Sequence, residues 1–303
     1  MKDKNLLTIE SLNKEEILEI LDAATLMKQG NYDKNLLENN ILASCFFEPS
    51  TRTRFSFESA MYRLGGKVIS LNGEEASSMK KGETLFDTIK VLGSYADIIV
   101  LRHPLEGVAK RAAEAVDKPI INAGDGAHEH PSQALIDLFS IRESQGSLEN
   151  LNIAVIGDLL HGRAVHSLVL AFLNFCNRLF FISPEEFSLP KSLSNKLRAK
   201  GIPFSFNKNL DDIIDNLDVL YVTRIQKERF YDKYDYLGVK NSYRISLEQL
   251  RGCKSNLKVF HPLPKVDEID VNIDNSPYAY YFIQATNGLY VRQALLAKLL
   301  RKL

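Results

Sequence analysis

Residues 46–57 read Phe-Phe-Glu-Pro-Ser-Thr-Arg-Thr-Arg-Phe-Ser-Phe, at the end of a mostly apolar run, Ile41–Phe47. Such a run is typical of a buried strand in a parallel sheet. Pro49 ends the run, and Ser50 or Thr51 can cap the helix that follows. That helix carries apolar residues at helical spacing: Phe55, Phe57, Met61 and Leu64. The stretch therefore predicts a strand–turn–helix unit, the repeating element of an α/β fold.

The turn of this unit concentrates side chains that bind anions: Ser50, Thr51, Arg52, Thr53 and Arg54. Free backbone N–H groups, the positive end of the helix dipole and a bidentate guanidinium together suit a phosphate dianion. The alternative is an ordinary capped turn with solvated arginines. Five such side chains in succession after a buried strand favour a phosphate site.

Composition limits what else the chain can do. Its 303 residues are enough for two α/β domains, and its 38 basic and 38 acidic residues cancel. With no net charge, we expect neither nucleic acid nor an anionic membrane as a partner. No apolar stretch reaches the roughly 20 residues of a membrane span, and Met1–Glu16 does not resemble a secretion signal. Cys45, Cys176 and Cys253 lie far apart, which predicts reduced thiols in a cytoplasmic protein and no structural zinc site.

Strand and helix signals alternate along the chain. After the first strand, strand-like runs lie at Lys67–Leu71, Ile98–Arg102, Pro119–Asn122, Asn152–Ile156, Arg178–Ile182, Pro203–Phe206, Val219–Thr223 and Lys258–Phe260. Helical patterns lie at Ser11–Lys28, Glu83–Tyr95, Gly107–Ala115, Pro131–Gln145 and Gly288–Leu300. Strands separated by helices predict βαβ units and parallel sheets. We predict two doubly wound domains, residues 1–145 and 146–286, with the helix in residues 287–303 packing back on the first.

Polar clusters recur where the predicted strands end. They are Ser50–Arg54, Arg102–Pro104, Asn122–Gln133, Gly157–Arg163, Thr223–Arg229 and His261–Pro264. In doubly wound sheets, ligands bind beyond the carboxyl ends of the strands. We therefore expect the active site in the cleft between the two domains.

These clusters resemble the motifs of the aspartate carbamoyltransferase catalytic chains, within the aspartate and ornithine carbamoyltransferase family. Ser50-Thr-Arg-Thr-Arg54 with Phe55-Ser-Phe-Glu58 is similar to the signature that both branches share. Three other segments resemble the aspartate branch: Ser77–Glu83, Thr223-Arg224-Ile225-Gln226 and His261-Pro-Leu-Pro264. The resemblance implies transfer of the carbamoyl group of carbamoyl phosphate to the amine of L-aspartate, an early step of pyrimidine biosynthesis.

The resemblance also assigns roles. Ser50, Thr51, Arg52 and Thr53 would hold the phosphate. Thr53, Arg102 and His130 would donate to the carbonyl oxygen, while Gln133 and the carbonyl groups of Pro262 and Leu263 would fix the carbamoyl nitrogen. Arg163 would bind the α-carboxylate of aspartate, and Arg224 with Gln226 the β-carboxylate. Ser77 and Lys81 would enter the site from a neighbouring subunit, with Lys81 contacting both substrates. Glu48 would form ion pairs with Arg163 and Arg229 when the cleft closes.

The chemistry itself needs a phosphate cradle, donors for a tetrahedral oxyanion and orientation of two anionic reactants. The sequence shows no obvious general base. The leaving phosphate can accept the amine proton, so we expect no covalent intermediate and no cofactor. His128 and His130 could instead ligate a metal, but no carboxylate or thiol cluster accompanies them at ligand spacing, and we expect none.

The resemblance further implies a homotrimer with active sites shared between subunits, with or without a regulatory chain or a partner enzyme. The residues alone equally allow Lys80 and Lys81 to be a solvated charge pair. Two other functions remain open: a carbamoyltransferase for ornithine or another amino acid, and a catalytically silent, anion-binding scaffold subunit.

Overall fold

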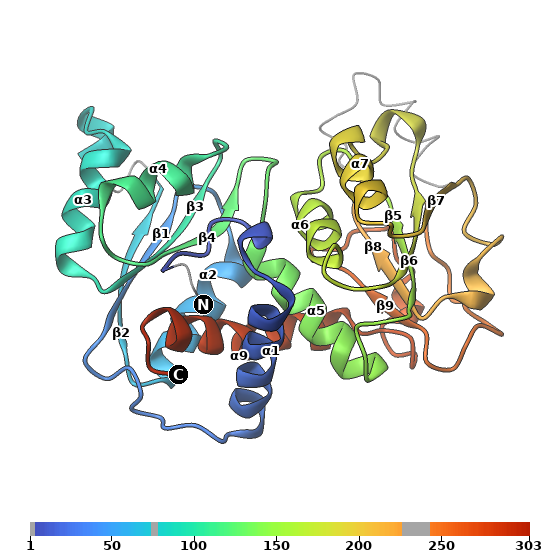
Figure 1. The fold of residues 1–303 in the computed structure, drawn as a ribbon, viewed down its shortest axis with the longest axis horizontal. Helices are drawn as coiled ribbons and strands as arrows, with labels where there is room; N and C mark the ends of the chain where they lie inside the picture. The colour runs from blue at the N-terminus through green and yellow to red at the C-terminus, as the bar shows by residue number, and fades with distance from the viewer. Residues whose placement is uncertain (1–3, 74–77, 226–242) are drawn as a thin grey trace. The chain divides into compact units, whose positions relative to one another are not determined.

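The structure is a computed structural model that describes residues 4–73, 78–225 and 243–303. The chain divides into two compact units. The first unit is Met1–Phe139 with Thr286–Leu303, and the second is Ser140–Ala285. Figure 1 shows that each is built on a sheet with helices packed against it. Within the described ranges, no helix has the length and apolar character that a bilayer span requires.

The first unit contains a four-stranded sheet in the order β2-β1-β3-β4, with every pairing parallel. Its strands are β1 (Ile41–Phe46), β2 (Lys67–Asn72), β3 (Ile98–His103) and β4 (Ile120–Asp125). Its helices are α1 (Lys14–Gln29), α2 (Thr51–Arg63), α3 (Leu85–Tyr95), α4 (Val108–Ala115) and the start of α5 (Pro131–Gln145). Short 3-10 turns lie at η1 (Ile9–Ser11) and η3 (Ser78–Lys81).

Helices cover both faces of this sheet, as the apolar strands require. Successive side chains of a strand point to opposite faces. Ala43 and Cys45 of β1 pack in one cluster with Ile89 of α3 and Val108 of α4. On the other face, the Ser44 hydroxyl donates to a carboxylate of α2. The sheet is therefore doubly wound.

The second unit contains a five-stranded parallel sheet in the order β7-β6-β5-β8-β9. The strands are β5 (Asn152–Ile156), β6 (Arg178–Ile182), β7 (Phe204–Asn207), β8 (Val219–Val222) and β9 (Lys258–Phe260). Helices α6 (Arg163–Phe172) and α7 (Lys191–Ala199) lie side by side, and short turns lie at η4 (Glu185–Phe187), η5 (Ile214–Asn216) and η7 (Val271–Ile273).

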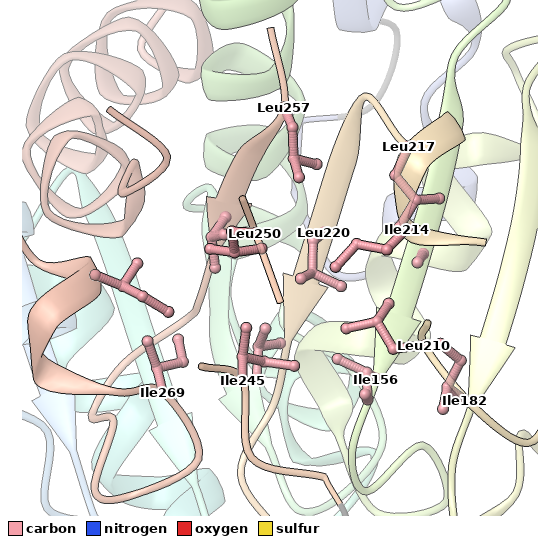
Figure 2. Packing of buried hydrophobic residues seen from close by; sticks show 14 of the residues in the cluster. Ile156, Ile182, Leu210, Ile214, Leu217, Leu220, Ile245, Leu250, Leu257 and Ile269 are labelled. Carbon is pink, nitrogen blue, oxygen red and sulfur yellow. The ribbon is translucent and has the colours of Figure 1, made fainter. Parts of the chain in front are cut away.

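One face of this second sheet is sealed by aliphatic side chains from the segments that connect and follow its strands. Figure 2 shows Ile156 and Leu220 of the sheet packing with Leu210, Ile245 and Ile269. All five side chains are at most 5% exposed, so this cluster is a continuous core. Burial on this scale holds the strand ends, and the residues that follow them, in fixed positions.

The predicted fold class, parallel-sheet α/β with two domains, is confirmed. The last helix differs from its predicted bounds. α9 spans Tyr281–Leu299 and does not start at Gly288, so it contributes to both units. Gly288 lies inside the helix, where a Cβ would meet Nη1 of Arg292 at 2.9 Å and Cδ1 of Ile136 at 3.2 Å. The glycine therefore allows close packing of these side chains and does not mark a helix end.

Candidate active site

The turn between β1 and α2 presents the predicted anion-binding side chains. Ser50 is the N-cap residue of α2, but its side chain makes no capping hydrogen bond, and the first turn contains no acidic residue. Thr53 is buried, whereas Thr51 and Arg52 are exposed. Partial desolvation lowers the pKa of the Arg52 guanidinium, although much of the side chain is exposed. The start of α2 therefore combines hydroxyls, helix N–H groups and a guanidinium, and the acidic Glu48 of the turn lies before the helix.

Arg54, two residues after Arg52, contacts other side chains of α2. Its guanidinium lies 4.5 Å from the centre of the Phe55 ring, and its Nε is 3.9 Å from Glu58 Oε1. The same Glu58 oxygen accepts from Ser44 Oγ at 2.9 Å and from Ser70 Oγ at 3.0 Å. Glu58 thus ties α2 to β1 and β2, and Arg54 belongs to this structural contact.

Arg102 lies beside the anion-binding turn because β1 and β3 are neighbouring strands. Phe46 pairs with Arg102 in the sheet register, and the Phe47 N–H donates to the Arg102 carbonyl at 2.9 Å. The Arg102 Nε donates to Glu48 Oε2 at 3.1 Å, an ion pair that orients the guanidinium. The predicted pairing of Glu48 with Arg163 and Arg229 stays a prediction, since Arg229 lies outside the described residues.

His130 and Gln133 stand at the start of α5, after β4. The His130 carbonyl accepts from the N–H groups of Gln133 at 2.9 Å and Ala134 at 3.2 Å, while Pro131 occupies the first helical position. His130 Nδ1 is 3.4 Å from Ser132 Oγ. A neutral imidazole with its proton on Nε2 would accept from that hydroxyl and keep Nε2 as a donor. The Gln133 amide donates to Asp137 Oδ1 at 2.7 Å, which fixes the side chain.

These residues gather where the strand order of the first sheet reverses. The chain passes from β1 to β2 on one side and then to β3 on the other, so the switch point lies between β1 and β3. Open α/β sheets bind ligands at this point, beyond the strand ends. Ser50–Thr53 follow β1, and Arg102 lies near the end of β3.

The second sheet has its switch point between β5 and β8, and each of these strands leads to a predicted aspartate ligand. Arg163 begins α6 after β5, and Arg224 follows β8. Both side chains are partly exposed. Gln226, Ser77 and Arg229 lie outside the described residues, and Lys81 is exposed at the end of η3.

The turn before Arg163 is held by side chains that the sequence left without a role. The buried Asp158 carboxylate accepts from the N–H groups of Leu160 at 3.1 Å and His161 at 2.9 Å. Gly157 has φ +123°, and a Cβ there would lie 2.0 Å from the Thr223 carbonyl oxygen. Only glycine fits where the β5 turn passes this close to the end of β8.

The turn after β9 carries Pro262 and Leu263. The Leu263 N–H donates to Nδ1 of His261 at 2.8 Å, and His261 Nε2 lies 2.8 Å from Glu268 Oε1. The Glu268 carboxylate also accepts from the N–H groups of Val266 and Asp267 at 3.1 Å. His261 and Glu268 are both buried, so this turn is folded around an imidazole–carboxylate pair.

Sequence reasoning missed two charged residues of the first unit, Asp137 and Arg292, which are 0% and 3% exposed. Each lies in a mostly apolar stretch of its helix, Leu135–Phe139 and Val291–Leu295, where a charge is costly unless it is paired or used. That pattern was the available signal. In the part of the chain that the structure describes, no group of three or more His, Cys, Asp or Glu side chains is placed to hold a metal ion.

Comparison with known proteins gives concordant matches over both units. The family model for the aspartate/ornithine carbamoyltransferase carbamoyl-P binding domain matches residues 4–143, and that for the Asp/Orn binding domain matches residues 149–299. The aspartate carbamoyltransferase catalytic subunit of Methanocaldococcus jannaschii is 52% identical over 301 residues, covering 98% of each chain. That of Vibrio campbellii is 49% identical over 302 residues, covering 99% of this chain and 97% of its own.

Solved structures agree with these matches. The M. jannaschii aspartate transcarbamoylase catalytic subunit aligns with TM-score 0.94 at 50% identity, covering 99% of this chain and 98% of its own. The Trypanosoma cruzi aspartate transcarbamoylase in complex with carbamoyl phosphate and aspartate aligns with TM-score 0.89 at 36% identity, covering 96% of this chain and 94% of its own. The matches therefore extend over both units and both switch points.

Proposed function

We propose, since this chain belongs to the aspartate/ornithine carbamoyltransferase family, that it transfers the carbamoyl group of carbamoyl phosphate to the amine of L-aspartate. The products are N-carbamoyl-L-aspartate and phosphate. The observation that supports this proposal is that each sheet carries one set of predicted ligands at its switch point. The first sheet has the predicted anion-binding turn, and the second sheet has two arginines. The T. cruzi relative with both substrates bound supports it.

The first unit is the carbamoyl phosphate-binding domain in this proposal. Ser50, Thr51, Arg52 and Thr53 hold the phosphate through hydroxyls, the guanidinium and the N–H groups that open α2. Thr53, Arg102 and His130 donate to the carbonyl oxygen. Arg102 is already oriented by Glu48, and Gln133, whose amide oxygen accepts from the carbamoyl nitrogen, is oriented by Asp137, so both side chains are arranged before the substrate arrives.

The second unit is the aspartate-binding domain. Arg163 binds the α-carboxylate, and Arg224 with Gln226 binds the β-carboxylate, because guanidinium forks match carboxylate geometry. The Pro262 and Leu263 carbonyls accept from the carbamoyl nitrogen. Since the transfer joins the two substrates, both sets of residues must act on the same pair of molecules.

The reaction proceeds through a tetrahedral oxyanion without a covalent enzyme adduct. The aspartate amine attacks the carbamoyl carbon, and Arg102, His130 and Thr53 stabilise the negative charge on the carbonyl oxygen. The departing phosphate accepts the amine proton, so His130 acts as a hydrogen-bond donor, need not be protonated and is not required as a base. Cys45 is no nucleophile, because burial raises the pKa of its thiol to about 12.

We further propose a homotrimer in which Ser77 and Lys81 complete the site of a neighbouring subunit. Such an assembly would cover some of the large apolar side chains that are exposed on α2, the edge strand β2 and α3: Phe55, Tyr62, Ile69, Phe86, Val91 and Tyr95. We place the enzyme in the cytoplasm, because all three cysteines are free thiols. The proposed reaction is an early step of pyrimidine biosynthesis.

The test is carbamoyl transfer by the purified chain, with aspartate and ornithine offered separately. Product from aspartate alone is expected. Product from ornithine would show that Arg163 and Arg224 have been assigned to the wrong substrate. If neither amino acid reacts, binding of N-(phosphonacetyl)-L-aspartic acid, the ligand of a T. cruzi relative structure, separates an assembled site from a silent homologue. Failure to bind it would reject the proposal.

A further inference from the structure

Arg292 is a buried cation that the proposed mechanism does not use. It lies on α9, more than two hundred residues after the anion-binding turn, yet within the same compact unit. Its side chain is 3% exposed, and within the described residues its Nε has no hydrogen-bond partner. A buried charge is expensive unless it is paired or serves a function. A stabilising contact or a function is therefore expected for Arg292.

One side of the guanidinium reaches the anion-binding turn. Arg292 Nη1 donates to Ser56 Oγ, and that hydroxyl lies 2.6 Å from the Arg52 carbonyl and 3.1 Å from the Thr53 carbonyl. The guanidinium also stacks on Phe57, 4.8 Å from the ring centre. Since Arg292 occupies an acceptor position of Ser56, it turns the hydroxyl proton towards the carbonyls of the first turn of α2. Arg292 thus supports the backbone of two predicted phosphate ligands.

Two charged groups act on Arg292 from neighbouring elements. Arg102 of β3, itself a predicted substrate ligand, repels it, and Asp137 of α5 attracts it. Asp137 in turn holds the Gln133 amide at 2.7 Å. Burial, followed by the charge of Arg102, lowers the pKa of Arg292 to about 9. The cation is therefore retained at neutral pH at an energetic cost, which a bound dianion would offset.

We propose that Arg292 is a positioning residue for carbamoyl phosphate. Through Ser56 it orients the first turn of α2, and its charge strengthens the field in which the phosphate binds. This role rests on the proposed function, but it concerns phosphate binding alone and can be measured without aspartate.

The experiment compares four variants of the full chain with the unchanged protein. Arg292→Met removes the charge at similar volume, Arg292→Lys restores the charge without the fork, and Ser56→Ala breaks the relay. Gln293→Leu is the matched control, because Gln293 is the next residue of α9, is 0% exposed and has no side-chain hydrogen bond to the described residues. Inorganic phosphate is the probe, and the readouts are its dissociation constant and the phosphate-dependent rise in Tm.

Arg292→Met is expected to weaken phosphate binding by about 10- to 100-fold, because the turn loses both a supporting hydrogen bond from a charged group and the nearby charge. Its rise in Tm at a given phosphate concentration should be smaller, because that rise follows the ratio of ligand concentration to dissociation constant. Ser56→Ala should lose less than Arg292→Met, Arg292→Lys should recover part of the loss, and Gln293→Leu should bind phosphate as the unchanged protein does. The KM for carbamoyl phosphate should rise more than the KM for aspartate.

Equal phosphate binding by Arg292→Met and Gln293→Leu would overturn the proposal. If Arg292→Met does not fold, Arg292→Lys and Ser56→Ala decide, and normal binding by both would overturn it. Failure of the proposed function is distinguishable, because the unchanged protein would then bind phosphate with the expected dependence on Arg292 but form no carbamoyl-aspartate.

Discussion

Arg52 and Arg54 lie two residues apart in one helix turn, yet their contacts indicate different roles. Arg54 contacts Glu58 and the Phe55 ring and joins the contacts that hold α2 to the sheet. Arg52 is exposed, and its helix turn contains no acidic residue. The N-cap residue Ser50, two positions earlier, makes no side-chain capping hydrogen bond. The sequence motif contains both arginines, and their side-chain contacts separate the predicted phosphate ligand from the structural residue.

Arg52→Ala is expected to lower turnover by about 10²- to 10³-fold and to abolish measurable phosphate binding, as loss of a preorganised charged donor does. Arg54→Ala should instead lower Tm while its folded fraction still binds phosphate. The two variants are compared by calorimetric titration with phosphate and by thermal unfolding. Equal phosphate affinity in both would contradict the assignment.

Arg224→Ala should raise the KM for aspartate by about 10- to 100-fold and leave the affinity for phosphate unchanged, since the second unit carries the aspartate ligands. Steady-state kinetics at saturating carbamoyl phosphate measures the first effect, and titration with phosphate measures the second. A variant that lost phosphate affinity instead would show that the division of labour between the units is wrong.

The lowered pKa of Glu268 predicts that the folded protein loses stability in acid. Burial alone would raise the pKa of its carboxyl, but the His261 imidazole at 2.8 Å and the N–H groups nearby lower it from 4.5 to about 2. A depressed folded-state pKa contributes stability that is complete above 4.5 and is lost as the pH falls towards 2. The contribution at neutral pH is at most about 3 kcal/mol.

Urea unfolding between pH 6 and 3 should therefore show a steeper loss of stability in the unchanged protein than in Glu268→Gln. Glu268→Gln should be the less stable of the two at pH 6, and the difference should narrow as the pH falls. Parallel curves would mean that Glu268 is not the titrating group.

At the scale of elements, the sites depend on how strand ends pass one another. β5 and β8 are neighbours, and the turn after β5 crosses so close to Thr223 that only Gly157 fits. This contact sets the path of the chain from β5 to Arg163, and Thr223 precedes Arg224. Backbone packing thus determines the spacing between the two predicted carboxylate ligands.

Gly157→Ala should destabilise the protein by at least about 2 kcal/mol, because the new Cβ meets a carbonyl and the residue keeps a positive φ. It should also raise the KM for aspartate in the fraction that folds. Gly201→Ala is the matched control, since Gly201 also has a positive φ but open space around its Cβ position. Chemical unfolding of both variants separates the clash from the cost of the backbone conformation, and an equal loss in the two would refute the close-approach argument.

At the scale of the whole molecule, the proposed trimer has a direct test. Arg52→Ala and Lys81→Ala chains should each be nearly inactive alone. If Lys81 serves the neighbouring subunit, each mixed trimer contains one intact site of three, and random mixing in equal amounts restores about a quarter of full activity. Activity after dissociation and reassembly of the mixture measures this. No recovery, with mixed trimers present, would place Lys81 in the site of its own subunit.

Local sequence signals were enough to predict the class of fold and most of its elements. Apolar runs and helical spacing predicted β1, β5 and α5 closely, because hydrophobic periodicity is a local property of the chain. The strand–turn–helix unit around Ser50 could be predicted for the same reason, and phosphate binding by its hydroxyls and arginines stays a prediction. The start of α9 could not, because Gly288 reads locally as a helix boundary while its role comes from packing against Ile136.

Long-range packing sets which of the predicted site residues lie near one another within each unit. The strand orders place the two switch points, and no local pattern specifies them, since pairing between distant strands depends on long-range contacts. The same holds for Arg292, which reaches Ser56 across 236 positions of sequence because α9 returns to the first unit. The local sequence indicates which side chains can bind a phosphate. The packing of distant elements places the buried charge, Arg292, that we propose supports those side chains.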